Sequence, residues 1–275
     1  MQLPQEGSVL PGHAATGSGS CRWLVSLDYD GTLRAEEPPH ISKAFLELMQ
    51  AWRPLGVRWG INTGRTLPYL YSELQAIAPC LPDFICTCER YIYLADANGH
   101  LQPETEHNQQ CERLNLKLRQ RLQPILHCKL AEIRRCHPEL KWELAATDPL
   151  SIEAADSPTM DAIVPHLMPL TTPGIAIQRA GRYLRFADAQ FSKGTALAYI
   201  CRTWGIPQQR LFIMGDGHND LHAFCQFPGA FCAAPADAHP EVIAELRQMG
   251  GYISPASGVE EALRTWYRER VLGRI

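Results

Sequence analysis

Apolar and polar positions alternate in two ways along the first third of the chain. Short apolar runs occur at 23–27, 57–61 and 83–88. Between them, over 41–53 and 65–78, apolar residues recur at the spacing of one helical face. This order predicts parallel strands connected by crossover helices.

Residues at the ends of these segments support the same elements. Ser42 precedes the first helical pattern as a candidate N-cap, and Pro68 falls in the first turn of the second, where a missing N–H costs little. A further apolar run at 91–94 is followed by Asn98-Gly99, a pair typical of tight hairpin turns. We therefore expect a hairpin there.

The pattern changes after Pro103. A long polar stretch with helical spacing runs from 106 to 135, with Pro124 as a candidate break. The predicted elements that follow pair as hairpins instead of crossing over, and this order predicts an inserted α+β domain at 103–180. They are strands at 141–146 and 150–154, a helix at 158–167, and strands at 175–179 and 183–187 around Gly181.

Alternation of apolar runs and helical patterns resumes beyond the insert. The fold class that it predicts is α/β, with a Rossmann-like, doubly wound parallel sheet as the core and an inserted α+β domain. We expect residues 21–102 and 181–275 to form this core and residues 1–20 to be a disordered tail. The remaining predicted elements are helices at 193–204, 240–249 and 258–272, a helix opening near Asn219, and strands at 211–214, 231–234 and 252–254.

Composition narrows the class of protein. The chain has 275 residues, 45% of them hydrophobic, and can bury a core without a disulfide or metal staple. The net charge is −3 without long runs of like charge, so we expect neither a nucleic-acid nor a membrane-surface partner. No uncharged apolar run approaches the ~20 residues that span a bilayer, and the first twenty residues lack a signal-peptide pattern. We expect a cytoplasmic protein, with its oligomeric state open.

Most of the ten cysteines lie inside apolar runs, as in 84–86 and 230–232, where a thiol behaves as a small hydrophobic residue. This distribution indicates a reducing compartment. Cys86 and Cys88 form the one tight pair, and their spacing fits neither a zinc knuckle nor a thioredoxin-type redox pair.

Two carboxylates follow the first predicted strand, in the sequence Asp28-Tyr29-Asp30-Gly31-Thr32. Ligands bind beyond the carboxyl ends of strands in an open parallel sheet, so both acids fall where a site is expected. An aspartate nucleophile suits phosphoryl transfer, with the second acid handling a proton and Mg²⁺ reconciling carboxylate with phosphate. For an Asp-x-Asp pair taken alone, acids that merely cap a turn are the alternative.

A calcium loop is a second alternative for the same segment. Counting from Ser26, Gly31 takes position six and Glu37 position twelve of such a loop. Position one is not a carboxylate and no helix is expected to enter the segment, so this alternative is disfavoured.

Two further segments offer groups that bind anions. Thr63 and Gly64, which follow the second predicted strand and precede Arg65, offer a hydroxyl and backbone N–H groups to a phosphate oxygen. Helix capping by Thr63 is the alternative. Lys193 opens a predicted helix, where a cation is electrostatically misplaced unless an anion lies beside it. A solvated lysine is the alternative.

The last candidate segment, Met-Gly-Asp-Gly-His-Asn-Asp, follows another predicted strand. Its Asp216 and Asp220 offer the hard oxygen ligands that Mg²⁺ prefers, and Asn219 can contact a phosphate without adding charge. His218 and His222 are four residues apart, but no third zinc ligand is evident. Solvated helix histidines are therefore favoured over a zinc site.

The four motifs occur in one order at successive strand ends, and as a set they strongly resemble the haloacid dehalogenase superfamily of aspartate-based phosphohydrolases. The resemblance covers 23–88 and roughly 181–254. The insert between the second and third motifs is similar to the large cap of subclass IIB, which includes Cof-type, sucrose-phosphate and trehalose-phosphate phosphatases. Cys88-Glu89-Arg90 stands where those relatives often carry an Asn-Gly pair.

The resemblance implies a role for each motif. Asp28 would be the nucleophile that forms an aspartyl phosphate, and it would bind Mg²⁺ together with Asp216 and the backbone carbonyl of Asp30. The Asp30 side chain would protonate the leaving oxygen and later activate water, and Asp220 would support the metal site from close by. The family's ATP-driven pumps carry Thr in place of Asp30, so the acid here favours a phosphatase or mutase. The residues that would hold the transferring phosphoryl group are Thr63, Gly64, Lys193 and Asn219.

We therefore expect a Mg²⁺-dependent phosphomonoester hydrolase that acts on a small sugar phosphate or related phosphorylated metabolite. The cap would set specificity by excluding water and bulky substrates. A phosphosugar mutase or phosphotransferase is one alternative, and a non-catalytic phosphometabolite-binding protein is another, disfavoured because such a protein needs no proton-transfer acid. Candidate substrate contacts of the cap are Glu143, Asp148, Arg179, Arg182 and Arg185.

Overall fold

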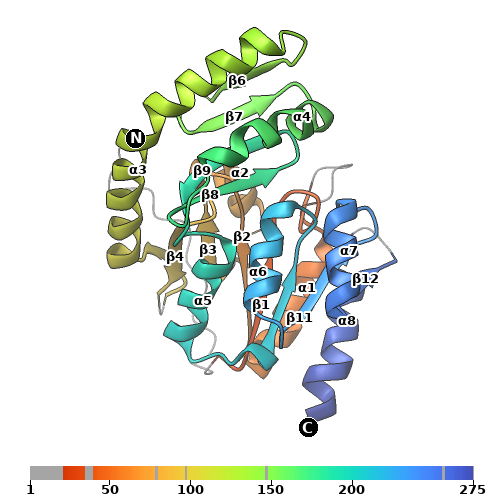
Figure 1. Ribbon diagram of the computed structural model, residues 1–275. Coiled ribbons are helices and arrows are strands. Elements are labelled where there is room, and N and C mark those ends of the chain that lie inside the picture. The colour runs from red at the N-terminus through yellow and green to blue at the C-terminus, as the bar shows by residue number, and fades with distance from the viewer. Residues whose placement is uncertain are drawn as a thin grey trace. The chain divides into compact units, whose positions relative to one another are not determined.

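The larger sheet of the computed structural model has eight strands within the described residues, in the order β12-β11-β10-β1-β2-β3-β4-β5 (Figure 1). The described residues are 21–34, 40–77, 80–96, 98–145, 148–255 and 258–274, so the predicted tail lies outside them. The strands are β1 Trp23–Leu27, β2 Val57–Asn62, β3 Phe84–Thr87, β4 Tyr91–Ala95, β5 Leu101–Pro103, β10 Leu211–Met214, β11 Phe231–Pro235 and β12 Tyr252–Ser254.

Strand β1 lies between β10 and β2 and is parallel to both. Leu27, the last residue of β1, lies opposite both Met214 of β10 and Ile61 of β2. The carboxyl ends of these three strands are therefore level, and the segments that follow them meet at one edge of the sheet. The strands from β12 to β3 are all parallel, whereas β4 and β5 extend the sheet antiparallel.

Helices cover both faces of this sheet, and the side chains of β1 show why. Val25 and Leu27 pack into one apolar cluster with α1, α2 and α8, whereas Leu24 packs into a second cluster with α5, α6 and α7. Successive strand residues face opposite sides, so a continuous apolar run is buried on both. The predicted doubly wound parallel core is confirmed. Its helices are α1 Lys43–Trp52, α2 Leu67–Ala76, α5 Lys193–Trp204, α6 Leu221–Gln226, α7 Pro240–Met249 and α8 Glu260–Trp266.

Local signals begin and end these helices as the sequence predicts. The Ser42 hydroxyl oxygen accepts a 3.1 Å hydrogen bond from the backbone N–H of Phe45, which confirms Ser42 as the N-cap of α1. Pro68 lies in the first turn of α2. Gly205, which follows α5, has a φ of +65°, a left-handed conformation that glycine adopts without steric cost.

The insert is a compact unit of its own that comprises residues 106–192, and the described residues 21–105 and 193–274 form the core unit. Its antiparallel sheet has the order β6-β7-β9-β8 (Figure 1). The sheet shares one apolar cluster with α3 and α4. The predicted boundary at residue 180 falls inside the β8–β9 hairpin, because β9 pairs with both β7 and β8. The elements are α3 Thr105–Cys136, β6 Trp142–Leu144, β7 Ser151–Ala154, α4 Ser157–Leu167, β8 Ile175–Ala180 and β9 Tyr183–Asp188.

Helix α3 runs through Pro124 without a break, so the expected break is wrong. Proline removes the hydrogen bond to the carbonyl four residues earlier, that of Gln120. Both residues are exposed, and that carbonyl can bond to water. On the opposite side, Leu118, Leu122 and Leu126 are buried at four-residue spacing in the apolar cluster of the insert. Packing of this stripe holds the helix together across the proline.

The burial of the cysteines agrees with their positions in apolar runs of the sequence. All ten cysteines are described, none forms a disulfide, and most are buried. Among the described helices, none combines the length with the apolar character that crossing a bilayer requires.

Candidate active site

Lys193 is the centre of a polar cluster at the carboxyl edge of the core sheet. It is the first residue of α5, its side chain is 1% exposed, and its Nζ lies 2.7 Å from Asp28 Oδ1 and 2.7 Å from Asp220 Oδ1. Asp28 directly follows β1, and Asp220 ends the 3₁₀ turn η4 (His218–Asp220) after β10. Two carboxylates of the chain therefore supply the anion expected beside Lys193.

Three carboxylates share this cluster. Ligand oxygens of Asp28, Asp216 and Asp220 lie within 4.8 Å of one another. Burial, together with the charges of Asp28 and Asp220, raises the pKa of Asp216 from 3.8 to about 8. Burial raises the pKa of Asp220 to about 7, although Lys193 opposes the shift. Negative charge in this cluster thus exceeds what one ammonium group compensates.

The donor set fits a hard divalent cation. Burial alone would lower the pKa of the Lys193 ammonium, but Asp220 and Asp28 outweigh burial and hold that pKa above its ordinary value. Lys193 is therefore a fixed positive charge among three carboxylates, whose oxygens are the ligands that Mg²⁺ prefers. Two further positive charges would offset the remaining negative charge.

Asp216 is oriented by the loop that follows β1. Its Oδ1 accepts a 2.9 Å hydrogen bond from the hydroxyl of Thr32. Gly31 has a φ of +71°, and a Cβ atom there would lie 2.6 Å from Asp216 Oδ2. A glycine is thus required at this position both for its conformation and for the space that Asp216 occupies.

Asp30 is not part of the carboxylate cluster and pairs with Arg65. Nε of Arg65 lies 2.7 Å from Asp30 Oδ2, and its Nη2 lies 3.1 Å from Oδ1, a bidentate contact that fixes both side chains. The structure therefore brings Asp28, Asp216 and Asp220 together as carboxylates, but not the Asp30 side chain. Arg65 was not predicted as a site residue, although its place directly after Thr63-Gly64 was a usable signal.

The segments that carry Thr63 and Asn219 meet at Glu89, a buried residue that the sequence did not single out as functional. The backbone N–H of Glu89 donates to the carbonyl of Thr63 at 2.9 Å, and Asn219 Nδ2 donates to Glu89 Oε1 at 2.9 Å. A Cβ atom at Gly64 would lie 3.3 Å from the same Oε1. Burial lowers the pKa of Lys193, but Asp220 and Asp28, and to a smaller extent Glu89, raise it above its ordinary value. Thr63, Gly64 and Asn219 are therefore close to Glu89, and Lys193 lies within range of its charge.

The backbone around Glu89 is strained. Cys88 and Glu89 have φ values of +50° and +62°, a left-handed region that residues other than glycine and asparagine seldom adopt. Both residues belong to Cys88-Glu89-Arg90, the segment where the resembling phosphatases often carry an Asn-Gly pair. The chain thus keeps the turn after β3 and places a carboxylate at its tip.

The alternative of a calcium loop is contradicted by the same geometry. Such a loop needs an entering helix, and the residues before Asp28 form the buried strand β1. The acids at this edge of the sheet belong instead to a Rossmann-like core whose ligand sites lie beyond the carboxyl ends of its central strands.

Comparison with known proteins identifies the family to which this Rossmann-like protein belongs. A family model described as haloacid dehalogenase-like hydrolase matches residues 84–263, which is more than half of the chain. The protein belongs to this family and is accordingly a hydrolase. The matched range includes Lys193, Asp216, Asn219 and Asp220, whereas Asp28 precedes it. A search of curated proteins found no significant match.

Solved structures share the fold at low sequence identity. Sucrose-phosphatase from Synechocystis sp. PCC6803, in complex with sucrose and phosphate, is 17% identical with a TM-score of 0.66, covering 90% of this chain and 98% of that one. BT1666, a phosphatase of the same superfamily from Bacteroides thetaiotaomicron, is 18% identical with a TM-score of 0.57. The match covers 91% of this chain and 97% of BT1666. The subclass IIB sugar phosphatase BT4131 is 16% identical with a TM-score of 0.58, covering 92% and 100%.

Proposed function

We propose that the protein is a Mg²⁺-dependent phosphomonoester hydrolase that works through an aspartyl phosphate on Asp28. The observation that carries the proposal is the contact of Lys193 Nζ with Asp28 Oδ1 at 2.7 Å, in a cluster that also holds Asp216 and Asp220. A carboxylate nucleophile and a phosphate are both anions, so a buried cation beside the nucleophile supports this chemistry.

The proposed reaction has two steps, in which Asp28 is the nucleophile and Asp30 transfers the proton. In the first step an Asp28 carboxylate oxygen forms a bond to phosphorus, the ester P–O bond breaks, and Asp30 supplies the proton that the leaving oxygen takes up. In the second step Asp30 accepts a proton from water, whose oxygen attacks phosphorus and releases Asp28 and inorganic phosphate. Arg65 would act as a positioning residue, because its ion pair at 2.7 Å fixes the Asp30 side chain.

The phosphoryl oxygens would be held by one cation and by neutral donors. Lys193 would neutralise charge, while the Thr63 hydroxyl and the Asn219 amide would donate hydrogen bonds, together with the backbone at Gly64. The metal would be held by Asp28, Asp216 and the backbone carbonyl of Asp30, with Asp220 close by. When bound, Mg²⁺ supplies positive charge that lets carboxylate and phosphate approach each other.

A small sugar phosphate or related metabolite is the proposed substrate. The family, together with the sugar phosphatases among the structural relatives, supports this class. The insert would act as the cap that selects the substrate. Two of the predicted contacts already have ionic partners inside the insert, because Arg179 pairs with Asp161 at 2.6 Å and Arg182 with Glu153 at 2.8 Å. Glu143, Asp148 and Arg185 stay candidates. We place the reaction in the cytoplasm, without nucleic-acid or membrane partners.

A phosphate-release screen tests the proposal. Purified protein is incubated with sugar phosphates, nucleotides and phosphorylated cofactors, with and without Mg²⁺, and free phosphate is measured. We expect Mg²⁺-dependent release, greatest for small sugar phosphates. An isomeric phosphate product without free phosphate would instead indicate a mutase. Tight binding of a monoester without turnover would indicate a binding protein and would contradict the hydrolase.

Stabilisation by Mg²⁺ should increase with pH. The raised pKa values of Asp216, about 8, and Asp220, about 7, mean that the folded protein keeps protons which the unfolded chain has released. Without metal, the free energy of unfolding therefore falls as pH rises from about 5 to about 8. Mg²⁺ binds the deprotonated carboxylates, so its stabilising effect grows over the same range. Thermal unfolding should show a larger Mg²⁺-induced rise in Tm at about pH 8.5 than at about pH 6. A shift that is equal or smaller at the higher pH would contradict this site.

Glu89→Gln should strengthen inhibition by inorganic phosphate. The substitution removes a buried negative charge beside Asn219 and keeps an oxygen that accepts its hydrogen bond. A phosphate dianion close to that position would bind about tenfold more tightly, since a charge pair at low dielectric interacts by more than 1 kcal/mol. The measurement is the inhibition constant of phosphate, with the exposed Glu47→Gln as the matched control. Unchanged or weaker inhibition would place Glu89 outside the phosphate site.

A further inference from the structure

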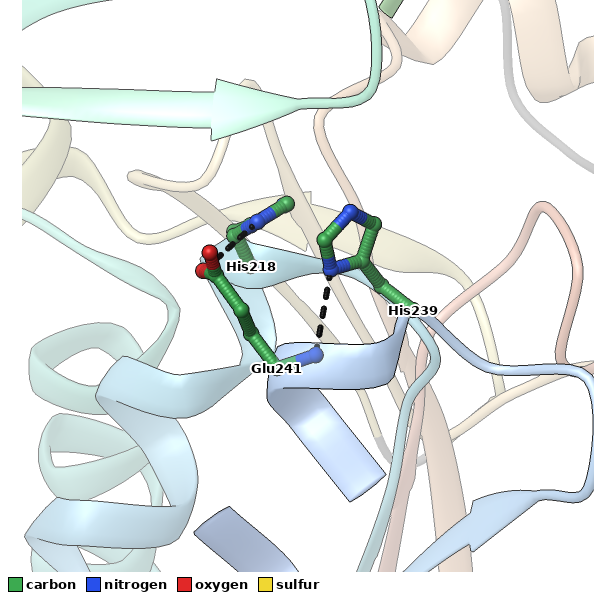
Figure 2. A group of neighbouring side chains, drawn as sticks. All are labelled: His218, His239 and Glu241. Atoms are coloured by element: carbon green, nitrogen blue, oxygen red, sulfur yellow. Dashed lines mark hydrogen bonds and ion pairs between the residues drawn. The ribbon is translucent and has the colours of Figure 1, made fainter. Parts of the chain in front are cut away.

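A second group of metal-ligand side chains lies in the core unit, outside the carboxylate cluster. Ligand atoms of His218, His239 and Glu241 lie within 4.8 Å of one another (Figure 2). His218 Nε2 is 3.0 Å from Glu241 Oε2, and the two imidazole ring centroids are 3.8 Å apart. The expectation that His218 is a solvated helix residue is wrong, because its side chain is only 12% exposed.

These residues come from two elements that the fold holds in place. His218 opens the turn η4 after β10, and His239 is the N-cap of α7, with Glu241 two residues later. His239 Nδ1 accepts a 3.3 Å hydrogen bond from the backbone N–H of Glu241, and the backbone N–H of His239 donates to the carbonyl of Asp216 at 2.9 Å. The start of α7 is thus tied to the loop that carries His218, independently of any metal.

The chemistry of this donor set differs from that of the catalytic cluster. Two imidazoles and one carboxylate suit Zn²⁺, which takes three protein ligands of this kind and leaves a further position for water. Mg²⁺ prefers oxygen ligands alone, as in the cluster of Asp28, Asp216 and Asp220. The side chain of Glu241 is 69% exposed, so an ion can reach the group from solvent.

We propose that His218, His239 and Glu241 form a Zn²⁺ site that is separate from the Mg²⁺ site. A simple ion pair between His218 and Glu241 would not explain why a ligand atom of a second imidazole lies within 4.8 Å of ligand atoms of both. Zn²⁺ bound there joins the 215–220 loop to the N-terminus of α7. Because this loop carries Asp216 and Asn219, the ion stabilises the frame of the catalytic site without touching its carboxylates.

Calorimetric titration of the full chain with Zn²⁺ tests the proposal. Excess Mg²⁺ is present to fill the carboxylate cluster, and the exposed thiols are removed by Cys128→Ser, Cys136→Ser and Cys225→Ser, because cysteine binds zinc. We expect one Zn²⁺ per chain and a rise in Tm. Absence of binding in this background, or binding that survives loss of the ligands, overturns the site.

Two variants test the ligands, and a third serves as the control. His239→Asn keeps an N-cap residue for α7 while removing the imidazole, and Glu241→Gln removes the carboxylate at nearly constant volume. Each should weaken Zn²⁺ binding by at least about tenfold, the loss that even an outer-shell change causes. His222→Gln, four residues from His218 but outside the group, is the matched control and should bind Zn²⁺ like the parent.

A last variant separates this site from the proposed catalytic site. Asp216→Asn should lose Mg²⁺-dependent phosphate release and keep Zn²⁺ binding, whereas His239→Asn should keep phosphate release with Mg²⁺ and lose Zn²⁺ binding. If Asp216→Asn abolishes Zn²⁺ binding as well, the ion binds at the carboxylate cluster and the second site is contradicted. If the parent protein releases no phosphate but binds Zn²⁺, the proposed hydrolase function is contradicted and the proposed Zn²⁺ site is not.

Discussion

Asp28→Asn should lower kcat by more than about a thousandfold, a rise in the barrier of about 4 kcal/mol. The substitution removes the charge of the proposed nucleophile at constant volume, and an amide oxygen does not form the phosphoryl bond. It also removes the negative charge that lies 2.7 Å from Lys193 Nζ. Lys193 keeps its contact with Asp220, also at 2.7 Å, so the fold should survive. The measurement is steady-state phosphate release together with thermal unfolding.

A second readout separates loss of the nucleophile from general damage to the site. Acid quenching of the parent enzyme during turnover should trap a phosphoryl group on the peptide that contains Asp28, detectable by mass spectrometry, and the variant should show none. Asp237→Asn, an exposed acid of the same unit, is the control and should behave as the parent. Residual activity above about a thousandth of the parent value, or a phosphorylated variant, would refute Asp28 as nucleophile.

The elements of the core follow from local sequence patterns, and the reason is visible in β1. Residues 23–27 are buried on both faces and all but Ser26 are apolar, so the segment is readily predicted as a buried strand. The N-cap at Ser42 and the glycine after α5 gave the ends of the neighbouring helices. The break predicted at Pro124 was wrong, because a proline breaks a helix only if the freed carbonyl stays unbonded and the buried face does not hold the helix together. The local sequence reveals neither the exposure of that carbonyl nor the packing of the buried face.

The candidate site was predictable where its residues directly follow strands. Asp28 and Asp216 lie at the level ends of β1 and β10, so their proximity follows from the parallel sheet itself. Glu89 was missed because its contact with Asn219 joins positions 130 residues apart and depends on a left-handed turn without glycine. The pairing of His218 with His239 was missed for the same reason, since a search for zinc spacing within one helix considers only near neighbours.

Lys193→Met should both inactivate and destabilise the protein. Removing the ammonium takes away a charge that would stabilise the transferring phosphoryl group, a loss on the order of 10²–10³ in kcat. It also leaves the buried carboxylates of Asp28 and Asp220 without their partner, and breaking a buried pair in this way costs about 3–5 kcal/mol. Lys43→Met, which removes a lysine that is 90% exposed, is the control and should change stability by less than about 0.5 kcal/mol.

The loss of stability in Lys193→Met should depend on pH in a definite direction. Lys193 lowers the pKa values of Asp216 and Asp220 in the folded parent, so these pKa values should rise further when the ammonium is removed. The difference in proton binding between the folded protein and the unfolded chain then extends to higher pH. Folding then binds protons, so the variant should lose stability relative to the parent as pH rises from about 6 to about 8.5. Denaturant unfolding at both pH values, without metal, measures this difference. If the difference in free energy of unfolding between variant and parent stays constant or shrinks as pH rises, Lys193 does not control the protonation of these carboxylates.

The double variant Lys193→Met, Asp220→Asn separates folding from catalysis. Removing one charge of each sign keeps the net charge of the buried cluster as in the parent and removes one of the two carboxylates that lost their partner. Stability should therefore recover in part, to within about 1–2 kcal/mol of the parent. Activity should remain at the level of Lys193→Met, because the phosphoryl group still lacks its cation. Recovery of activity together with stability would mean that Lys193 serves the fold alone, and the proposed phosphate site would then need another cation.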